Sequence, residues 1–155
     1  MKENKVELLE IKVTDIGKIK GLWEELNQHH YEVSTNFKEE YRNFKFDERM
    51  SLLKEKAKKS ILKIDVVNDK NINKLVGYCI SSIDENNNGE VESLYLKKEY
   101  RGHKIGENLM KRSLEWMDEN QVITKKIVVA AGNENVFSFY QKYGFQHKYD
   151  VMYIL

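Results

Sequence analysis

A short basic stretch in the second half of the chain, Lys97–Lys104, contains residues that could bind a phosphate group. Its positively charged or polar members near the end are Arg101, His103 and Lys104. Gly102 and Gly106 lack a β-carbon, so the backbone there can come close to a ligand. From Ile105 onward the apolar residues fall at helical spacing. The first N–H groups of a helix are unpaired and lie at the positive end of its dipole, so the stretch predicts an anion site.

The residues just before this stretch form the strand that must position it. Glu90–Leu96 alternates with a period of two, as a half-buried strand does. One face would carry Val91, Ser93 and Tyr95, and the other would carry Glu92, Leu94 and Leu96. Strand, basic turn and helix then follow one another directly, which is the arrangement that presents helix N–H groups to a phosphate.

A second group of chemically useful residues follows about 30 positions later. Asn133 and Tyr140 are seven residues apart, about two helical turns. They would project from one side of a helix if both lay on it. The helix would end at Gly144, a residue typical of helix C-termini.

The two stretches together resemble the GNAT family of acetyl-CoA-dependent N-acetyltransferases. That family's signature at the strand-to-helix turn is Arg or Gln, two residues, Gly, one residue, then Gly or Ala. Arg101 and Gly106 match it, and Lys104 replaces the middle glycine. The second stretch matches the family's asparagine and its helix ending in Tyr-x-Lys-x-Gly-Phe, with a bulkier Val136 where small residues often stand. The resemblance covers residues 74–155, and the N-terminal half agrees in element order only.

This resemblance implies that the chain binds acetyl-CoA. The pyrophosphate would lie on the N–H groups of six successive residues: Arg101, Gly102, His103, Lys104, Ile105 and Gly106. The pantetheine arm would add to the exposed edge of the fourth strand, because a bulge separates that strand from the fifth. By position, this edge is the backbone of Leu94, Tyr95 and Leu96. Asn133 would bond the pantetheine arm or a nearby water, or cap the helix, and these roles are compatible.

The reaction implied is attack of an amine on the acetyl thioester, without a covalent enzyme intermediate. Tyr140 would protonate the departing thiolate, since a phenol titrates near ~10 and a thiol near ~8.5. The alternative is a core tyrosine that packs its ring and bonds its hydroxyl to the backbone. Glu92 would accept the proton of the amine, directly or through water, or would be a solvated strand residue. His29 and His30 are weaker candidates for this base.

The function implied is transfer of the acetyl group of acetyl-CoA to a primary amine of a small molecule or peptide, in a ternary complex. The alternative is a CoA-binding module of the same fold without turnover, in a sensing or assembly role; the retained Tyr140 argues against it. A P-loop phosphotransferase is excluded, because Glu107 follows Gly106 where that motif has lysine. Acidic residues in the expected acceptor wall favour a cationic amine or form a solvated helix face. They are Glu24, Glu25, Glu32, Glu39 and Glu40.

The amino-acid composition further limits the class of protein. The 155 residues include 26 basic and 25 acidic ones, for a net charge of +1, which gives no support for a nucleic-acid binder. Cys79 is the single cysteine, so no internal disulfide is expected, and a single cysteine fits a reducing compartment. We interpret Cys79 as a small hydrophobic residue buried in a strand. No metal site is expected. The chain start is not of signal-peptide type, and no run approaches ~18 apolar residues. We therefore expect a cytoplasmic protein without a membrane partner, and a monomer and a homodimer both stay open.

The element pattern predicts an α+β fold in a single domain over residues 1–155. The expected order is β-α-α-β-β-β-α-β-α-β, with a mixed, mostly antiparallel sheet of six to seven strands flanked by helices. Expected strands are Val6–Val13, Ser60–Val67, Lys74–Ile83, Glu90–Leu96, Lys126–Ala131 and Phe145–Leu155. Expected helical segments are 16–26, 37–44, 47–58, 105–120 and 136–143. Lys104 is expected in an ordinary helical-entry conformation, without a positive φ.

Overall fold

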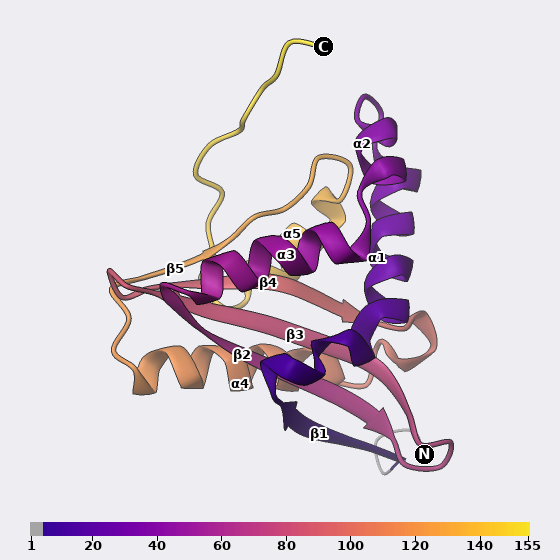
Figure 1. The fold of residues 1–155 in the computed structure, drawn as a ribbon, viewed down its shortest axis with the longest axis vertical. Coiled ribbons are helices and arrows are strands. Elements are labelled where there is room, and N and C mark those ends of the chain that lie inside the picture. The colour runs from indigo at the N-terminus through magenta and orange to yellow at the C-terminus, as the bar shows by residue number, and fades with distance from the viewer. Residues whose placement is uncertain (1–4) are drawn as a thin grey trace.

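A five-stranded sheet forms the centre of the computed structural model, which describes residues 5–155. The strands lie side by side in chain order (Figure 1) and are β1 Val6–Ile11, β2 Ser60–Asp69, β3 Lys74–Asp84, β4 Asn88–Leu96 and β5 Thr124–Ile127. Neighbouring strands are antiparallel, except that β4 and β5 are parallel. Asp84 closes the predicted polar turn between β3 and β4, because its carboxylate accepts the backbone N–H groups of Asn86 and Asn88.

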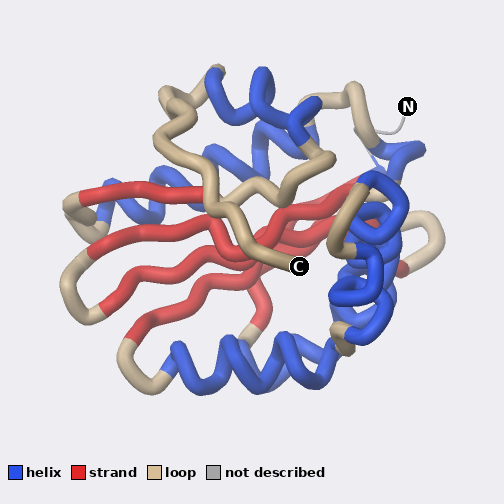
Figure 2. Tube along the Cα trace, turned by 90° about the horizontal axis from the view of Figure 1, so that it is seen from above, coloured by secondary structure: helices blue, strands red, loops and turns tan. Residues whose placement is uncertain are grey.

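Helices cover both faces of this sheet (Figure 2). Between β1 and β2 lie a 3₁₀ segment, Val13–Ile19, and the helices α1 Lys20–Val33, α2 Lys38–Asn43 and α3 Phe46–Ala57. After β4 come a 3₁₀ turn, Lys98–Tyr100, and helix α4 Ile105–Glu119. A further 3₁₀ turn, Glu134–Val136, and the short helix α5 Phe137–Gln141 follow β5. The mixed α+β fold class is confirmed. Between β1 and β2, α-helices form at each of the three expected helical segments, although the expected element order counts only two helices there.

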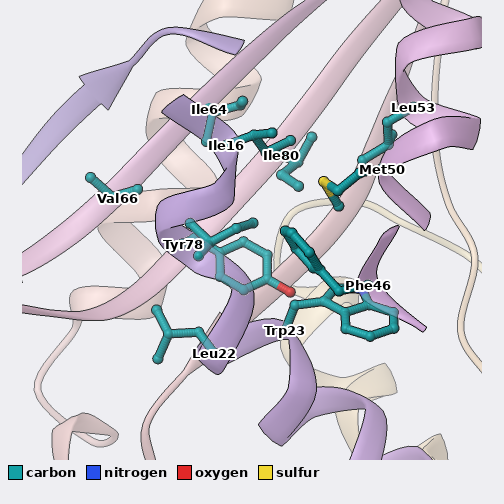
Figure 3. Close-up of a cluster of buried hydrophobic side chains, with 11 residues drawn as sticks. Ile16, Leu22, Trp23, Phe46, Met50, Leu53, Ile64, Val66, Tyr78 and Ile80 are labelled. Atoms are coloured by element: carbon teal, nitrogen blue, oxygen red, sulfur yellow. The ribbon is translucent and has the colours of Figure 1, made fainter. Parts of the chain in front are cut away.

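The face covered by α1 and α3 contains an aromatic-rich core (Figure 3). Trp23 of α1 packs edge-to-face on Phe44 and Phe46, at centroid distances of 5.6 and 5.7 Å. Such pairs contribute about 0.5–1.5 kcal/mol beyond the burial of their area. Tyr78 of β3 is fully buried here and shares a hydrogen bond of 2.8 Å with Ser93 of β4. This core therefore fixes α1 and α3 relative to the middle of β4.

The opposite face is covered by α4, whose apolar stripe fills a second core. Its buried helix residues are Ile105, Leu109, Met110 and Met117. Their spacing of three to four residues is the one predicted for an amphipathic helix. Phe139 and Tyr140 of α5 pack against the same core. The second motif of the sequence is thereby placed beside the start of α4.

The C-terminal stretch differs from the prediction. No strand forms between Phe145 and Leu155, so the described residues make a five-stranded sheet and the predicted six to seven strands are wrong. Figure 1 shows this stretch, in yellow, as a loop leading away from the sheet. Its alternating side chains stay exposed, with Tyr153 near Phe37 at a ring distance of 6.3 Å. Alternation can specify a strand with two faces, but a strand also needs a partner edge.

Strand β4 contains a one-residue irregularity that changes which side chains share a face. Ile80 is opposite Ser93 while Ser81 is opposite Val91, so Glu92 is the extra residue of a β-bulge. Val91 faces the α4 core, whereas Glu92 contacts α3 and Ser93 contacts Tyr78 on the other face. The prediction that Val91 and Ser93 share a face is therefore wrong, since the bulge shifts the alternation by one residue.

No helix within residues 5–155 combines the length and the apolar character needed to cross a lipid bilayer.

Candidate active site

The second half of β4 has an open edge. β5 pairs with β4 over Asn88–Val91 only, and the two strands separate at the bulge residue Glu92. From there to Leu96, β4 is paired with β3 alone. Backbone groups on such an edge can pair with an added extended segment. The structure thus supplies the bulge and the exposed edge that the resemblance implied.

The directions of the backbone groups identify which residues serve this edge. The Lys97 N–H donates to the Val76 carbonyl of β3 at 2.9 Å. In an antiparallel ladder successive residues point their N–H and C=O groups to opposite sides, so Tyr95 also points toward β3 and Leu94 and Leu96 point outward. The outward Leu96 carbonyl accepts the Nε–H of Arg101 at 2.9 Å. Leu94 is therefore the residue whose N–H and C=O both face the open edge.

The turn between β4 and α4 is built from two left-handed residues. Gly102 has φ 82° and Lys104 has φ 63° with ψ 9°. The prediction of an ordinary helical entry for Lys104 is wrong. The left-handed region costs a non-glycine residue roughly 1 kcal/mol, which explains why the family favours glycine here. The turn is needed because it reverses the chain from the end of β4 into α4.

The predicted anion-binding residues do lie around the N-terminus of α4. Arg101, Gly102 and Lys104 are exposed, His103 and Gly106 are half-buried, and Ile105 anchors the helix in the core. The Arg101 guanidinium lies 5.6 Å from the centroid of the Tyr95 ring, so its side chain already has two protein partners. A β-carbon on Gly106 would meet only the Phe139 ring, at 3.8 Å. Protein packing therefore does not require glycine at position 106, whereas close approach of a ligand would.

Glu92 is held by an ion network rather than solvated. Its side chain is 4% exposed and pairs with Lys56 and, at 3.4 Å, with Arg49, both on α3. It also accepts the Ser82 hydroxyl at 2.6 Å. Burial alone would lower the pKa of Lys56, but hydrogen bonds and charge from Glu92 and Glu90 raise it above its ordinary value, so Lys56 is charged at neutral pH. Accepting a proton would cost Glu92 these pairs, which disfavours it as a general base.

Tyr140 lies half-buried against the α4 core, beside Phe139 and Phe145. Burial, with a smaller effect from the nearby Cys79, raises the pKa of Tyr140 to about 12. Its phenol is therefore fully protonated at neutral pH. Burial likewise raises the pKa of the Cys79 thiol to about 12, so Cys79 is not a nucleophile and matches the small buried hydrophobe predicted for it.

Asn133 and Tyr140 do not lie on one continuous helix. Asn133 precedes a 3₁₀ turn, and α5 begins at Phe137. The Asn133 side chain makes no capping hydrogen bond. Instead its Oδ1 lies 2.9 Å from the Nε2 of His29 on α1. This contact joins residues 104 positions apart, and no local sequence signal could have predicted it.

One face of α1 runs beside the open edge. Glu25 pairs with Lys97 at the end of β4, at 2.9 Å, and His29 and Val33 meet the loop at Gly132 and Asn133. His30 points elsewhere, with its ring 5.4 Å from that of Tyr41. Burial and the neighbouring His29 lower the pKa of His30 to about 4. A base that weak is unsuited to take a proton from an amine, so His30 is not a good candidate for the role.

The acidic residues of the predicted acceptor wall do not converge. All five are exposed: Glu24, Glu25, Glu32, Glu39 and Glu40. Glu25 pairs with Lys97, and Glu39 pairs with Arg42 at 2.8 Å. Glu24 lines a pocket of about 270 Å³ between α1 and α2, together with several aromatic residues. The distribution matches the alternative of a solvated helix face.

The anchors of the bulge were missed by sequence reasoning. Arg49 donates to the Glu92 carbonyl at 3.1 Å as well as pairing with its carboxylate. Lys56 reaches both Glu92 and Glu90. Their spacing of seven residues, two turns on one helix face, was the available signal. Within residues 5–155 no group of three or more His, Cys, Asp or Glu side chains is arranged to hold a metal ion.

The structure thus combines a split parallel pair of strands, an open edge on β4 and the N-terminus of α4 after that edge. A family model described as "Acetyltransferase (GNAT) family" matches residues 22–145. This match covers most of the chain, and the protein therefore belongs to the GNAT acetyltransferase family. No curated protein sequence matches the chain significantly.

Solved structures of the same fold agree with this assignment. A Pyrococcus furiosus protein described as an acetyl transferase superposes with a TM-score of 0.72, at 19% identity, covering 97% of this chain and 99% of that one. The PaiA N-acetyltransferase of Thermoplasma acidophilum, in complex with coenzyme A, gives 0.69 at 21% identity, covering 92% and 91%. The aminoglycoside N-acetyltransferase AAC(6′)-Iy, in complex with CoA, gives 0.68 at 13% identity, covering 97% and 93%. At such identities these structures establish a common fold.

Proposed function

We propose that this protein is an N-acetyltransferase that transfers the acetyl group of acetyl-CoA to a primary amine of a small molecule or peptide. Transfer occurs by direct attack in a ternary complex. The observation that carries the proposal is the open edge of β4 at Leu94, next to the glycine-bearing N-terminus of α4 in a GNAT-family chain. Family membership supports acetyl transfer in general. The identity of the cofactor, the class of acceptor and the roles of the residues are what we propose here.

The residues present fit the two chemical parts of acetyl-CoA. The pantetheine arm is a chain of amides, and the outward N–H and C=O of Leu94, with the outward N–H of Leu96, match it. The pyrophosphate is an anion, and the backbone from Arg101 to Gly106 leads into an unpaired helix start. Lys104 and His103 add positive or polar groups at the same place. Tyr95 contributes its ring, since its backbone is used by β3.

Tyr140 is proposed to donate its phenolic proton to the departing sulfur. The acetyl thioester supplies an activated carbonyl, so that a C–N bond forms as the C–S bond breaks, with one proton lost by nitrogen and one gained by sulfur. The pKa of the Tyr140 phenol is about 12, whereas the pKa of a free thiol is ~8.5, so proton transfer from Tyr140 to a solvated thiolate would be uphill. Exclusion of water from the site by bound substrates would raise the pKa of the departing thiol toward that of the phenol, because burial disfavours the thiolate.

The proton of the amine is proposed to leave through water rather than directly to Glu92. The Glu92 carboxylate keeps its pairs with Lys56 and Arg49, and its role is to hold the bulge that opens the edge. Its negative charge still favours a positive charge developing on a nearby nitrogen. Of the two routes predicted for Glu92, direct or through water, this proposal keeps the one through water.

The acceptor is proposed to be a small molecule or peptide bearing a primary amine. AAC(6′)-Iy is described as an aminoglycoside N-acetyltransferase, and the similar structure of meta-AAC0020 as an aminoglycoside acetyltransferase in complex with sisomicin. Aminoglycosides are therefore one class of amine to test here. Calorimetry with CoA, followed by CoA-release assays with acetyl-CoA and a panel of polyamines, aminoglycosides and lysine peptides, tests the proposal. Binding of CoA and release with at least one amine class is expected. Absence of CoA binding would remove the proposal.

Three further points belong to the same proposal. The whole chain, residues 1–155, is taken as one GNAT domain. A cytoplasmic location suits a protein with one free thiol, which stays reduced there. A homodimer is a further option, to be measured by light scattering. The competing function is that of a CoA-binding module without turnover. Such a protein would bind CoA equally well, but it would release no CoA from acetyl-CoA with any amine.

A further inference from the structure

We propose that His29 is a positioning residue that orients the side-chain amide of Asn133 toward the bound cofactor. The inference rests on the proposed function and adds a residue from the opposite wall of the site. Its basis is the 2.9 Å contact between His29 Nε2 and Asn133 Oδ1. Both side chains are half-buried, so the bond is partly shielded from water.

The atoms in this contact determine what Asn133 can offer to a ligand. An amide oxygen only accepts hydrogen bonds, so the Nε2 of His29 carries the proton and donates. This bond uses one lone pair of the Asn133 oxygen and fixes the direction in which the amide faces. Its Nδ2 has no hydrogen-bond partner within residues 5–155. Asn133 therefore presents an N–H donor, which suits a carbonyl of the pantetheine arm or of the thioester.

The backbone around Asn133 brings the loop before α5 close enough to α1 for this bond. Gly132 has φ 97°, and a β-carbon placed on it would lie 2.3 Å from the Val33 carbonyl oxygen at the end of α1. Only glycine permits this approach. One helical turn earlier on the same face of α1 lies His29. The loop before α5 is thus pressed against α1 at two adjacent points, which fixes the donor and the acceptor of the bond.

A mutant cycle on CoA affinity, measured by calorimetry, tests the proposal. His29→Ala and Asn133→Ala should each weaken CoA binding about five- to tenfold, as expected for the loss of one hydrogen bond. The double variant should bind no more weakly than Asn133→Ala alone, because His29 acts through Asn133. His29→Gln should restore binding to within about threefold, since the glutamine amide can donate at the place of Nε2. His30→Gln is the matched control and should leave CoA affinity unchanged.

The outcomes separate this inference from the function on which it rests. If the unmodified protein fails to bind CoA, the proposed function falls and the inference falls with it. If it binds CoA and His29→Ala has no effect, or the losses in the double variant add, the inference alone is overturned. If His29→Gln keeps CoA affinity but loses about 100-fold in kcat, His29 is a base and the positioning role is overturned.

Discussion

The two halves of β4 share one strand and one neighbour, β3, but differ on their other edge. Asn88–Val91 is paired on both sides, and its residues serve the fold. From Glu92 to Leu96 the β5 side is open, and the turn that leads into α4 contacts its end through the bond from Arg101 to the Leu96 carbonyl. One extra residue, Glu92, separates these halves. A single extra residue in a strand thus marks the point where pairing on one edge ends.

The largest expected effect is on the reaction rate, through the residue proposed to protonate the departing thiolate. Tyr140→Phe should lower kcat about 100-fold or more, because general-acid catalysis contributes on this scale. The phenolic hydroxyl has no protein hydrogen-bond partner within residues 5–155, so CoA affinity and thermal stability should stay nearly unchanged. Steady-state kinetics with calorimetry distinguish these quantities. Tyr143→Phe, on the same short stretch, is the control; equal losses from both variants would contradict the assignment.

The bulge residue Glu92, which separates the two halves of β4, is held by ion pairs with α3 that a substitution can remove. Glu92→Gln should lower the free energy of unfolding by about 2–3 kcal/mol, since it leaves the partly buried Lys56 and Arg49 with a neutral partner. Chemical denaturation measures this loss. Glu55→Gln removes an exposed pair with Lys58 and should cost less than about 0.5 kcal/mol. If the two variants are equally stable, the ion network does not anchor the bulge.

The open edge itself can be tested by removing one backbone donor. Leu94→Pro should weaken CoA binding about tenfold, because its outward N–H is lost while the β3 ladder stays intact. Leu94→Ala controls for the loss of side-chain packing and should retain CoA affinity. Tyr95→Pro removes an N–H that serves β3 and should cost about 3 kcal/mol of stability. The reverse pattern between the two proline variants would show that the edge is assigned to the wrong residues.

The turn after β4 gives the smallest expected effect. Lys104→Gly should raise the free energy of unfolding by up to about 1 kcal/mol, because glycine adopts φ 63° without strain. It should weaken CoA binding only modestly and mostly at low salt, through loss of one charge near the phosphates. Thermal unfolding and calorimetry at two ionic strengths check both parts. A loss of stability would mean that Lys104 makes contacts that outweigh its backbone strain.

Most elements of the fold were predictable from the sequence. The strands at Ser60, Lys74 and Glu90 and the helix at Ile105 begin within two residues of the predicted positions, because alternation, helical spacing and polar turns all agreed there. The final strand failed because Phe145 and the residues after it alternate without showing which edge they would pair with. Pairing depends on the partner, which a pattern within one segment does not contain.

The site was predictable in part, as far as local motifs reach. The resemblance placed the anion turn and Tyr140 near each other, and the structure brings α5 against the start of α4. The resemblance implied a bulge in this strand, but its position at Glu92 was not predicted, because the alternation of residue types does not show where an extra residue interrupts the pairing. The left-handed Lys104 and the His29 contact depend on tertiary context. Such features cannot be read from propensity or spacing alone.

Amide hydrogen exchange, resolved residue by residue by NMR with and without CoA, tests the central claim most directly. The account predicts that saturating CoA slows exchange of the Leu94 N–H at least about tenfold, because this group gains a hydrogen-bond partner on the open edge. The N–H groups of Asn88–Val91, already paired on both sides, should change little by comparison. Binding of CoA without any slowing at Leu94 would contradict the claim that the open half of β4 holds the cofactor.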